Sequence, residues 1–338
     1  MRFETVRMIS LASGLCLLSF SRPLAAAPGY QHFLVGNPAD VTTATTGLLV
    51  LQGGGTDVDE NFVRMGAAAG GGDFVVIRAS GTDAYNPYIL ELCNCDSVET
   101  IVFKNRNAAS NAFVIERIRN AEALFIAGGD QSRYVDFWKN TPVEDAINYL
   151  ANTKKVPIGG TSAGMAIMSE FLYSAMSNSS LTSAEALADP FHRDLTLDRD
   201  FVALPKLNAK ITDQHLQERD RMGRTVAFLA RLVRDGWTAQ GLAIAADRET
   251  ALHVNPVDGT AEVFATSTHP TPFVYFLRTT GPPEVCEPGA PLTFRNVEVY
   301  RIGPGDRFDL DDWRGVGGIA YTLSAENGVL TSSRGEIY

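Results

Sequence analysis

Residues 158–168 read IGGTSAGMAIM, and this stretch decides the fold. A run of small and apolar residues enters a tight turn at Ser162, and a second such run leaves it. We interpret the first run as a buried strand and the second as a helix. Small neighbours are needed because a sharp strand-to-helix turn is strained and crowded. The pattern Gly160-x-Ser162-x-Gly164 therefore predicts a nucleophile elbow. The alternative is a plain turn whose serine caps a helix.

Upstream of the elbow, short apolar runs alternate with helical stretches. The runs cover residues 47–52, 74–77, 100–103, 123–127 and 156–159. This alternation predicts a mostly parallel sheet with helices on both faces. In such sheets, ligands bind beyond the carboxyl ends of the strands. The segments expected to meet at this rim are residues 53–55, 79–83, 128–131 and the Ser162 turn.

The N-terminal segment differs from the rest of the chain. Arg2 and Arg7 flank a basic start, residues 8–20 are apolar, and small residues follow at 23–27. This layout predicts a signal peptide over residues 1–27, the alternatives being an uncleaved amphipathic start or a short anchor. The mature protein would then be secreted or periplasmic, with no membrane contact after cleavage.

Residues 28–338 are predicted to form a single α/β domain. A helix is expected from about Gln214 to about Arg234, and from about residue 253 short strands alternate with Gly and Pro turns. The formal net charge of -10 argues against a nucleic-acid partner. The histidines are too scattered for a metal site, and residues 53–55 lack a dinucleotide fingerprint, so we expect no metal and no cofactor.

Three cysteines follow the predicted cleavage site, namely Cys93, Cys95 and Cys286. Export permits a disulfide. Because Cys93 and Cys95 are close in sequence, we expect Cys286 to pair with one of them, unless all three are reduced.

Two backbone N–H groups are candidates for an oxyanion hole. The N–H of Ala163 follows the nucleophile directly and would face the developing negative charge. The segment 128–131, GGDQ, follows the strand that precedes the elbow strand, so an N–H of Gly129 or Asp130 could complete the hole. Gln131 could hold a polar group of the substrate, the alternative being a plain β-turn.

A serine hydroxyl needs a base, and histidine is the usual one. The sequence has five histidines, and His215 is the best candidate because it lies at a predicted strand-to-helix junction on the rim.

Three arginines, Arg219, Arg221 and Arg224, follow His215 on the first turns of the predicted helix. Positive charge is unfavourable at a helix N-terminus, so the cluster predicts an anionic ligand such as a substrate carboxylate. The alternative is a solvated face in which Glu218 and Asp220 pair with the arginines.

Taken together, four blocks resemble the cyanophycinase family of serine peptidases, relatives of aspartyl dipeptidase E. In family order they are residues 53–57 (GGGTD), 128–131 (GGDQ), 160–164 (GTSAG) and 213–215 (DQH) with the three arginines. They are spread over about residues 47–252. The resemblance implies a flavodoxin-like α/β fold related to class I glutamine amidotransferases, with serine instead of cysteine at the elbow.

The resemblance also implies a Ser-His-acid triad that cleaves β-aspartyl bonds, with Ser162 as nucleophile and His215 as base. The residues implied in substrate binding are Gln131, Asp213, Gln214, Arg219, Arg221 and Arg224.

The acid is where this chain departs from the family pattern. The family tends to show Asp-Glu-x-Thr-Ala, and this chain has Asp247-Arg248-Glu249-Thr250-Ala251. We predict that Glu249 takes the role one place along the chain, with Glu185 as the alternative.

The substrate that the resemblance implies is cyanophycin, a polyaspartate with arginine on its side-chain carboxyls, and the products are β-Asp-Arg dipeptides. An exported enzyme would suit digestion of polymer released from dead cells, and it could assemble as a homodimer. Two alternatives remain. The first is a peptidase for other isoaspartyl peptides, and the second is a catalytically silent homologue that binds peptides.

Overall fold

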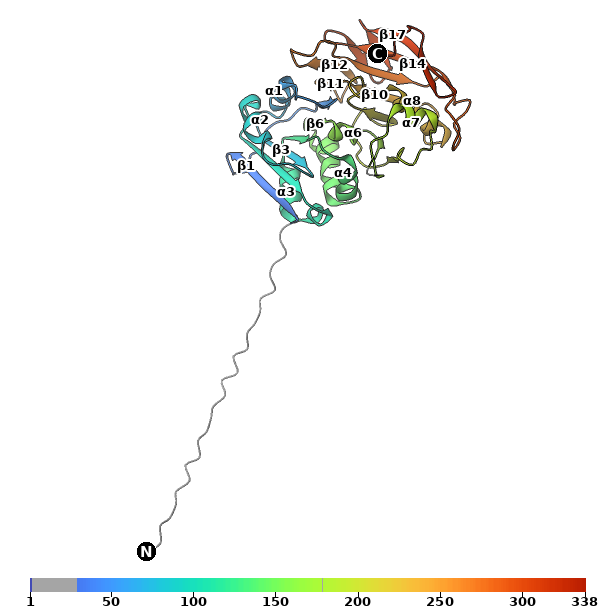
Figure 1. Ribbon diagram of the computed structural model, residues 1–338. Coiled ribbons are helices and arrows are strands. Elements are labelled where there is room, and N and C mark those ends of the chain that lie inside the picture. Colours follow the sequence, from blue (N-terminus) through green and yellow to red (C-terminus); the bar gives the residue numbers. More distant parts are fainter. Residues whose placement is uncertain (2–28, 178) are drawn as a thin grey trace.

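The computed structural model describes residues 1, 29–177 and 179–338, which form two β-sheets with helices packed against them (Figure 1). The predicted α/β class is confirmed. The predicted signal peptide, residues 1–27, lies outside the described residues apart from Met1. Within the described part of the chain, no helix is long and apolar enough to cross a membrane.

The first sheet has a parallel centre and antiparallel edges. It runs in the order β1 (Tyr30–Gly36), β4 (Ser97–Phe103), β3 (Asp73–Arg78), β5 (Ala123–Ile126), β6 (Ile158–Thr161), β2 (Leu49–Gln52), β11 (Thr250–Val254), β12 (Thr260–Ala265), β15 (Arg307–Asp309) and β16 (Arg314–Val316). Neighbours from β4 to β2 are parallel, and the other pairs are antiparallel.

Helices cover both faces of the parallel centre, as predicted. Phe74 and Val76 of β3 join one hydrophobic cluster, which also contains residues of α1 (Asp59–Ala68) and α2 (Tyr85–Cys93). Val75 and Ile77 point to the opposite face and join another cluster. The segments on that face are η1 (Arg106–Ser110), α3 (Ala112–Asn120), α4 (Gln131–Trp138), α5 (Pro142–Tyr149) and η2 (Leu150–Lys154). Burial on both faces explains why these strands read as nearly continuous apolar runs.

The second sheet is mostly antiparallel. It runs in the order β18 (Val329–Ser332), β17 (Ile319–Glu326), β14 (Phe294–Ile302), β13 (Val274–Arg278), β10 (Leu242–Ala246), β9 (Lys210–Asp213), β7 (Phe171–Tyr173) and β8 (Leu197–Arg199). Parallel pairing is limited to β7 with β9 and β9 with β10. Both sheets are therefore mixed, and the expectation of a mostly parallel sheet holds only for the centre of the first. The reason is that short turns connect the later strands, and short turns join only antiparallel neighbours.

The two sheets share one hydrophobic cluster. Ile244 and Phe276 of the second sheet belong to the same cluster as Leu252 and Val263 of the first. The opposite face of the second sheet packs against α7 (Ser183–Ala188) and α8 (Met222–Arg234). The expected helix start near residue 214 is wrong, because residues 214–221 form a turn before α8. That turn carries the predicted base.

The cysteines pair differently from the expectation. The disulfide joins Cys93 to Cys95, and in the described part of the chain Cys286 is a free, buried thiol. Cys286 lies in the hydrophobic cluster of the second sheet, whereas Cys93 belongs to the cluster beside α1 and α2. Residence in separate clusters explains why Cys286 has no part in the bridge.

Candidate active site

Ser162 sits on a sharp turn between β6 and α6 (Ala163–Ala166). Its backbone angles are φ 51° and ψ -115°, a conformation that side-chain-bearing residues rarely adopt. The positions on either side must be glycine, because a side chain there would collide with neighbouring backbone atoms. A methyl group on Gly160 would stand 2.7 Å from the carbonyl carbon of Gly164, and one on Gly164 would stand 2.0 Å from the carbonyl oxygen of Ile126. The strand, turn and helix predicted for the elbow are confirmed. Because α6 is a single turn, its dipole adds little, and the N–H of Ala163 is the group that the elbow supplies.

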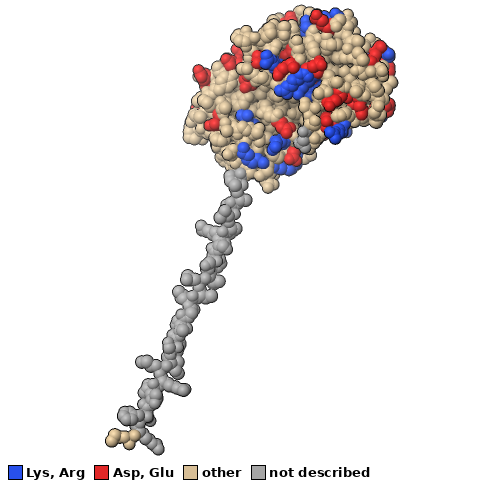
Figure 2. All heavy atoms as spheres, in the orientation of Figure 1, with Lys and Arg blue, Asp and Glu red and all other residues tan. Residues whose placement is uncertain are grey.

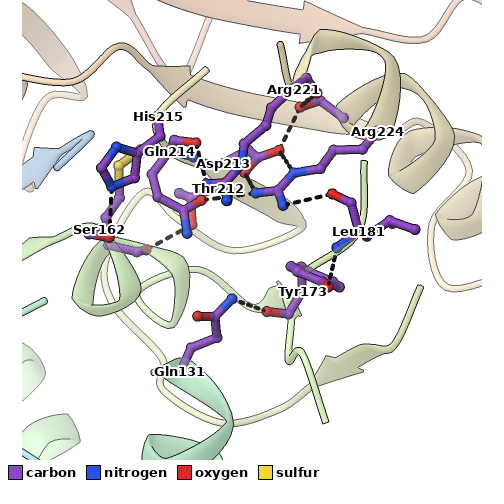
Figure 3. A network of polar contacts seen from close by, with 12 residues as sticks. Gln131, Ser162, Tyr173, Leu181, Thr212, Asp213, Gln214, His215, Arg221 and Arg224 are labelled. Atoms are coloured by element: carbon purple, nitrogen blue, oxygen red, sulfur yellow. Dashed lines mark hydrogen bonds and ion pairs between the residues drawn. The ribbon is translucent and has the colours of Figure 1, made fainter. Parts of the chain in front are cut away.

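His215 reaches the elbow from the second sheet. It follows β9, and its own N–H donates to the carbonyl oxygen of Gly53 over 2.8 Å. The Ser162 hydroxyl lies 3.0 Å from Nε2 of the imidazole, and His215 is 6% exposed (Figure 3). Two stretches from different sheets therefore meet at the predicted serine and histidine.

Gly54 makes room for the imidazole. Its φ is +102°, and a methyl group there would stand 2.3 Å from Nε2 of His215. The glycine at this position is thus demanded both by the backbone and by the ring beside it.

Gly54→Ala should therefore lower kcat/KM by ~10²-fold or more, because the added methyl pushes the ring away from the serine. Steady-state kinetics on the two variants checks this. Gly236→Ala is the matched control. Its φ is +71° and nothing lies within 4 Å of the added methyl, so it carries the backbone cost without the collision. Equal kinetics for both variants would contradict the explanation.

The carboxylate that contacts the imidazole of His215 belongs to Glu218. Its Oε2 lies 2.9 Å from Nδ1 of His215, at the ring nitrogen that the serine does not use. Glu249, predicted for this place, instead accepts hydrogen bonds from Thr56 over 3.3 Å and from Thr266 over 3.4 Å. The prediction of Glu249 is thus corrected, because the 214–221 turn folds its own glutamate back onto the ring.

The alternative acid, Glu185, is also elsewhere. It forms a capping box with Thr182 at the start of α7. Sequence reasoning assigned Glu218 only to pairing with the arginines. The sequence shows an acid three residues after the histidine, but the conformation of the turn is what brings it to the ring.

The electrostatics of the pair favour a base. Burial lowers the pKa of His215 below its ordinary value, the hydrogen bond with Glu218 opposes this, and the charges of Arg219 and Arg221 add to the lowering. Burial opposes ionisation of Glu218, but the contact with His215 and the charges of Arg219 and Arg248 hold its pKa below the usual range. At neutral pH the carboxylate is ionised and the ring neutral, so Nδ1 donates to Glu218 and Nε2 accepts from Ser162.

A cavity of about 250 Å³ opens beside Ser162 and is lined mainly by polar side chains. Its walls include Gly129, Asp130, Gln131, Tyr173, Gln214, Arg219, Arg221 and Arg224. The cavity thus gathers almost every residue expected to bind substrate. Tyr134 fixes the glycine segment by donating to the carbonyl oxygens of Ala127 and Gly128 over 2.8 and 3.1 Å.

Asp213 is the exception among the predicted binding residues, since it lies behind the cavity. It is 1% exposed and holds Arg224 through two hydrogen bonds, one of them 2.9 Å from Nε to Oδ2 (Figure 3). Thr225 also donates to Oδ2, over 2.8 Å. Asp213 therefore positions an arginine of the wall.

The arginines leave the cavity with an excess of positive charge. Arg221 is 6% exposed and donates to the carbonyl oxygen of Gln214 over 2.9 Å. Burial, followed by the charge of Arg224, lowers its pKa to about 10. Since Asp213 offsets mainly Arg224, the cavity suits an anionic group. Among residues 29–177 and 179–338, no group of three His, Cys, Asp or Glu side chains stands where it could hold a metal ion.

Known proteins similar to this chain are peptidases. The sequence model of Peptidase family S51 matches residues 85–255, half of the chain. The cyanophycinase of Trichormus variabilis and that of Nostoc sp. are each 28% identical over 228 residues, which cover 66% of this chain and 68% of theirs. A crystal structure of a peptidase from an acI-B1 Actinobacterium superposes with a TM-score of 0.49 and 15% identity, over 79% of this chain and 98% of that one. On the strength of the family match and the sequence relatives, the chain belongs to peptidase family S51 and is a serine-type peptidase.

Proposed function

We propose that the protein is an exported peptidase that acts on β-aspartyl peptides and degrades cyanophycin to β-Asp-Arg dipeptides. The observation that carries the proposal is the 3.0 Å contact between Ser162 and His215 at the wall of an arginine-lined cavity. The cyanophycinases to which the chain is similar support the choice of polymer.

The geometry supports acyl transfer through a covalent intermediate. The Ser162 hydroxyl attacks the scissile carbonyl while Nε2 of His215 takes its proton. The N–H groups of Ala163 and Gly129 would hold the negative charge that develops on the carbonyl oxygen. His215 then gives the proton to the departing amine, and a water molecule activated by the same ring releases the product from Ser162.

The arginine cavity accounts for the choice of substrate. In cyanophycin each arginine is joined through its amino group to an aspartyl side chain, so its own carboxylate is free. That carboxylate would bind to Arg221 and Arg224, with Gln131 and Gln214 placed for polar contacts. The face drawn in Figure 2 mixes acidic and basic side chains. Recognition of the substrate would therefore depend on the cavity more than on the electrostatic potential of the whole surface.

Hydrolysis of purified cyanophycin tests this proposal. We expect β-Asp-Arg to accumulate, measured by mass spectrometry, and not to accumulate with Ser162→Ala. Intact polymer together with cleavage of isoaspartyl dipeptides would replace it with the narrower isoaspartyl peptidase.

Arg221→Met should raise KM by ~10- to 100-fold, with a smaller change in kcat, because a charged hydrogen bond to the substrate contributes about 1.5–3 kcal/mol. The methionine replaces the aliphatic part of the side chain and removes the guanidinium with its charge. Arg193→Met is the control, since that side chain is 87% exposed and lies outside the cavity walls. Unchanged KM for Arg221→Met would show that the carboxylate binds elsewhere.

We further propose that the parallel strands form a flavodoxin-like core. Taken by chain position, β3 to β6 lie in the order 2-1-3-4, which matches the first four places of the flavodoxin arrangement. The fifth place, which the last strand takes in flavodoxin, is here filled by β2, which precedes the other four in the chain. Export is proposed from the layout of residues 1–27, and N-terminal sequencing of the mature protein, expected to begin at about residue 28, tests it.

A further inference from the structure

We propose that Glu218 is the carboxylate that orients His215 and stabilises its protonated form, so that the acid of the triad lies on the same turn as the base. The inference rests on the proposed roles of Ser162 and His215. It assigns a positioning residue, because Glu218 acts on the reaction through the imidazole. Ser162 and His215 are 53 positions apart in the sequence. His215 and Glu218 are three positions apart.

The turn itself brings the glutamate to the ring. His215 has a φ of 51°, which reverses the chain direction directly after β9. The N–H of Arg219 then donates to the carbonyl oxygen of His215 over 3.1 Å, and that of Arg221 to Leu216 over 2.8 Å. These hydrogen bonds close a compact turn, in which the Glu218 side chain folds back to Nδ1.

Asp247 fixes the turn from outside. Its Oδ1 accepts the N–H of Gln217 over 3.0 Å, next to the residue whose carboxylate meets the ring. Asp247 is 1% exposed, and burial raises its pKa to about 7. It holds the backbone at Gln217, and Glu218 is the carboxylate that, among the described residues, reaches the imidazole.

Arg248 lies near the same carboxylate, and its guanidinium also lies 3.7 Å from a carboxylate oxygen of Glu249. It lines a surface pocket of about 450 Å³ together with Glu218, Asp247 and His269. Its charge favours the ionised form of Glu218. In the five-residue segment where the family resemblance places an acid, this chain therefore carries a cation that supports an acid on the neighbouring turn.

The charged groups near His215 act either on the ring itself or on the turn that holds Glu218. Arg219 and Arg221 disfavour its protonated form, and Glu218 favours it. Asp247 and Arg248 act on the turn and on Glu218. Glu249 accepts hydrogen bonds from Thr56 and Thr266 and forms an ion pair with Arg248 over 3.7 Å. From the loop over the ring, residues 53–55 contribute no charge because all three are glycine.

Glu218→Gln tests the assignment through the reactivity of Ser162 toward a serine-directed fluorophosphonate, measured from pH 4 to 9. At neutral pH we expect the labelling rate constant to fall by ~10²- to 10⁴-fold, the scale seen when a triad carboxylate becomes an amide. A glutamine can also donate to Nδ1, which selects the wrong tautomer. Because Glu218 raises the pKa of His215, the midpoint of the acid limb should move to lower pH. Asp247 is the same in both proteins, so a shifted midpoint reports on Glu218.

Glu249→Gln is the matched control and should label like the wild type, with the same midpoint. Glu218 is 36% exposed, so its variant should keep the fold, which a thermal melt checks. Wild-type labelling and midpoint in Glu218→Gln, or a loss of labelling in Glu249→Gln, would overturn the assignment. If wild-type Ser162 fails to label at any pH, the proposed function fails instead, and the two outcomes are separate because no peptide substrate is needed.

Discussion

Ser162→Ala should lower kcat on a cleavable peptide by ~10⁴- to 10⁶-fold, the scale observed when the nucleophile of a serine peptidase is removed. The loss is expected to be this large because His215, Glu218 and the arginine cavity cannot act without an oxygen to carry the acyl group. The fold should persist. Alanine keeps the same Cβ, and the hydroxyl has its contact with His215 and no structural partner on β6 or α6.

Ser180→Ala provides the matched control for this experiment. Ser180 lines the same cavity and has an exposed side chain, but it lies in the chain segment before α7 and away from the elbow. Its variant should retain kcat within a few-fold. Steady-state kinetics and active-site labelling distinguish the two serines, and activity of Ser162→Ala within tenfold of wild type would remove Ser162 from the mechanism.

Asp213→Ala should lower the free energy of unfolding by about 3–5 kcal/mol, because it leaves the guanidinium of Arg224 buried without its counter-ion. Both side chains are 1% exposed. Urea denaturation measures the change. Asp311→Asn is the control, since its ion pair with Lys206 is half exposed and should contribute about 1 kcal/mol at most. Equal stability of the two variants would show that the buried pair contributes no more than a surface pair.

The same pair predicts a direction for the pH dependence of stability. Burial alone would raise the pKa of Asp213, but the charge and hydrogen bonds of Arg224 hold it below the usual value. The folded state therefore binds a proton less readily than the unfolded chain. The stability that ionised Asp213 contributes is complete above the pKa of an aspartate in the unfolded chain, about 3.9. It is lost as the pH falls through the lower pKa of Asp213 in the folded state. In Asp213→Ala this acid-sensitive part should be absent.

The elbow and the rim were predictable because each depends on local sequence. Glycines flank Ser162 on both sides, and the apolar runs 47–52 and 123–127 have the length and composition of buried parallel strands. Parallel strands end at the same edge, so their polar ends had to meet. The base was predictable for a different reason, since its segment reads as a strand followed by a polar, basic stretch, although β9 belongs to the second sheet.

The acid was not predictable, because its position depends on the conformation of a turn. Residues 214–221 carry good helix formers, and a helix starting at residue 214 would have turned Arg219 away from Arg221. The positive φ of His215 and the contact of Gln217 with Asp247 instead close a turn before Met222. Neither feature leaves a mark in the sequence near the glutamate. The second sheet escaped prediction as well, because short strands joined by turns do not reveal which sheet they extend.

Ser162 follows a strand of the first sheet and His215 follows a strand of the second, and this affects when the site can form during synthesis. A ribosome releases Ser162 long before His215, and the segment at Asp247 that braces the histidine turn follows later still. A nascent chain thus holds an unactivated alcohol until both layers have closed. The 53 positions that separate nucleophile and base therefore leave the serine unactivated until the turn after β9 has been translated and has packed against the elbow.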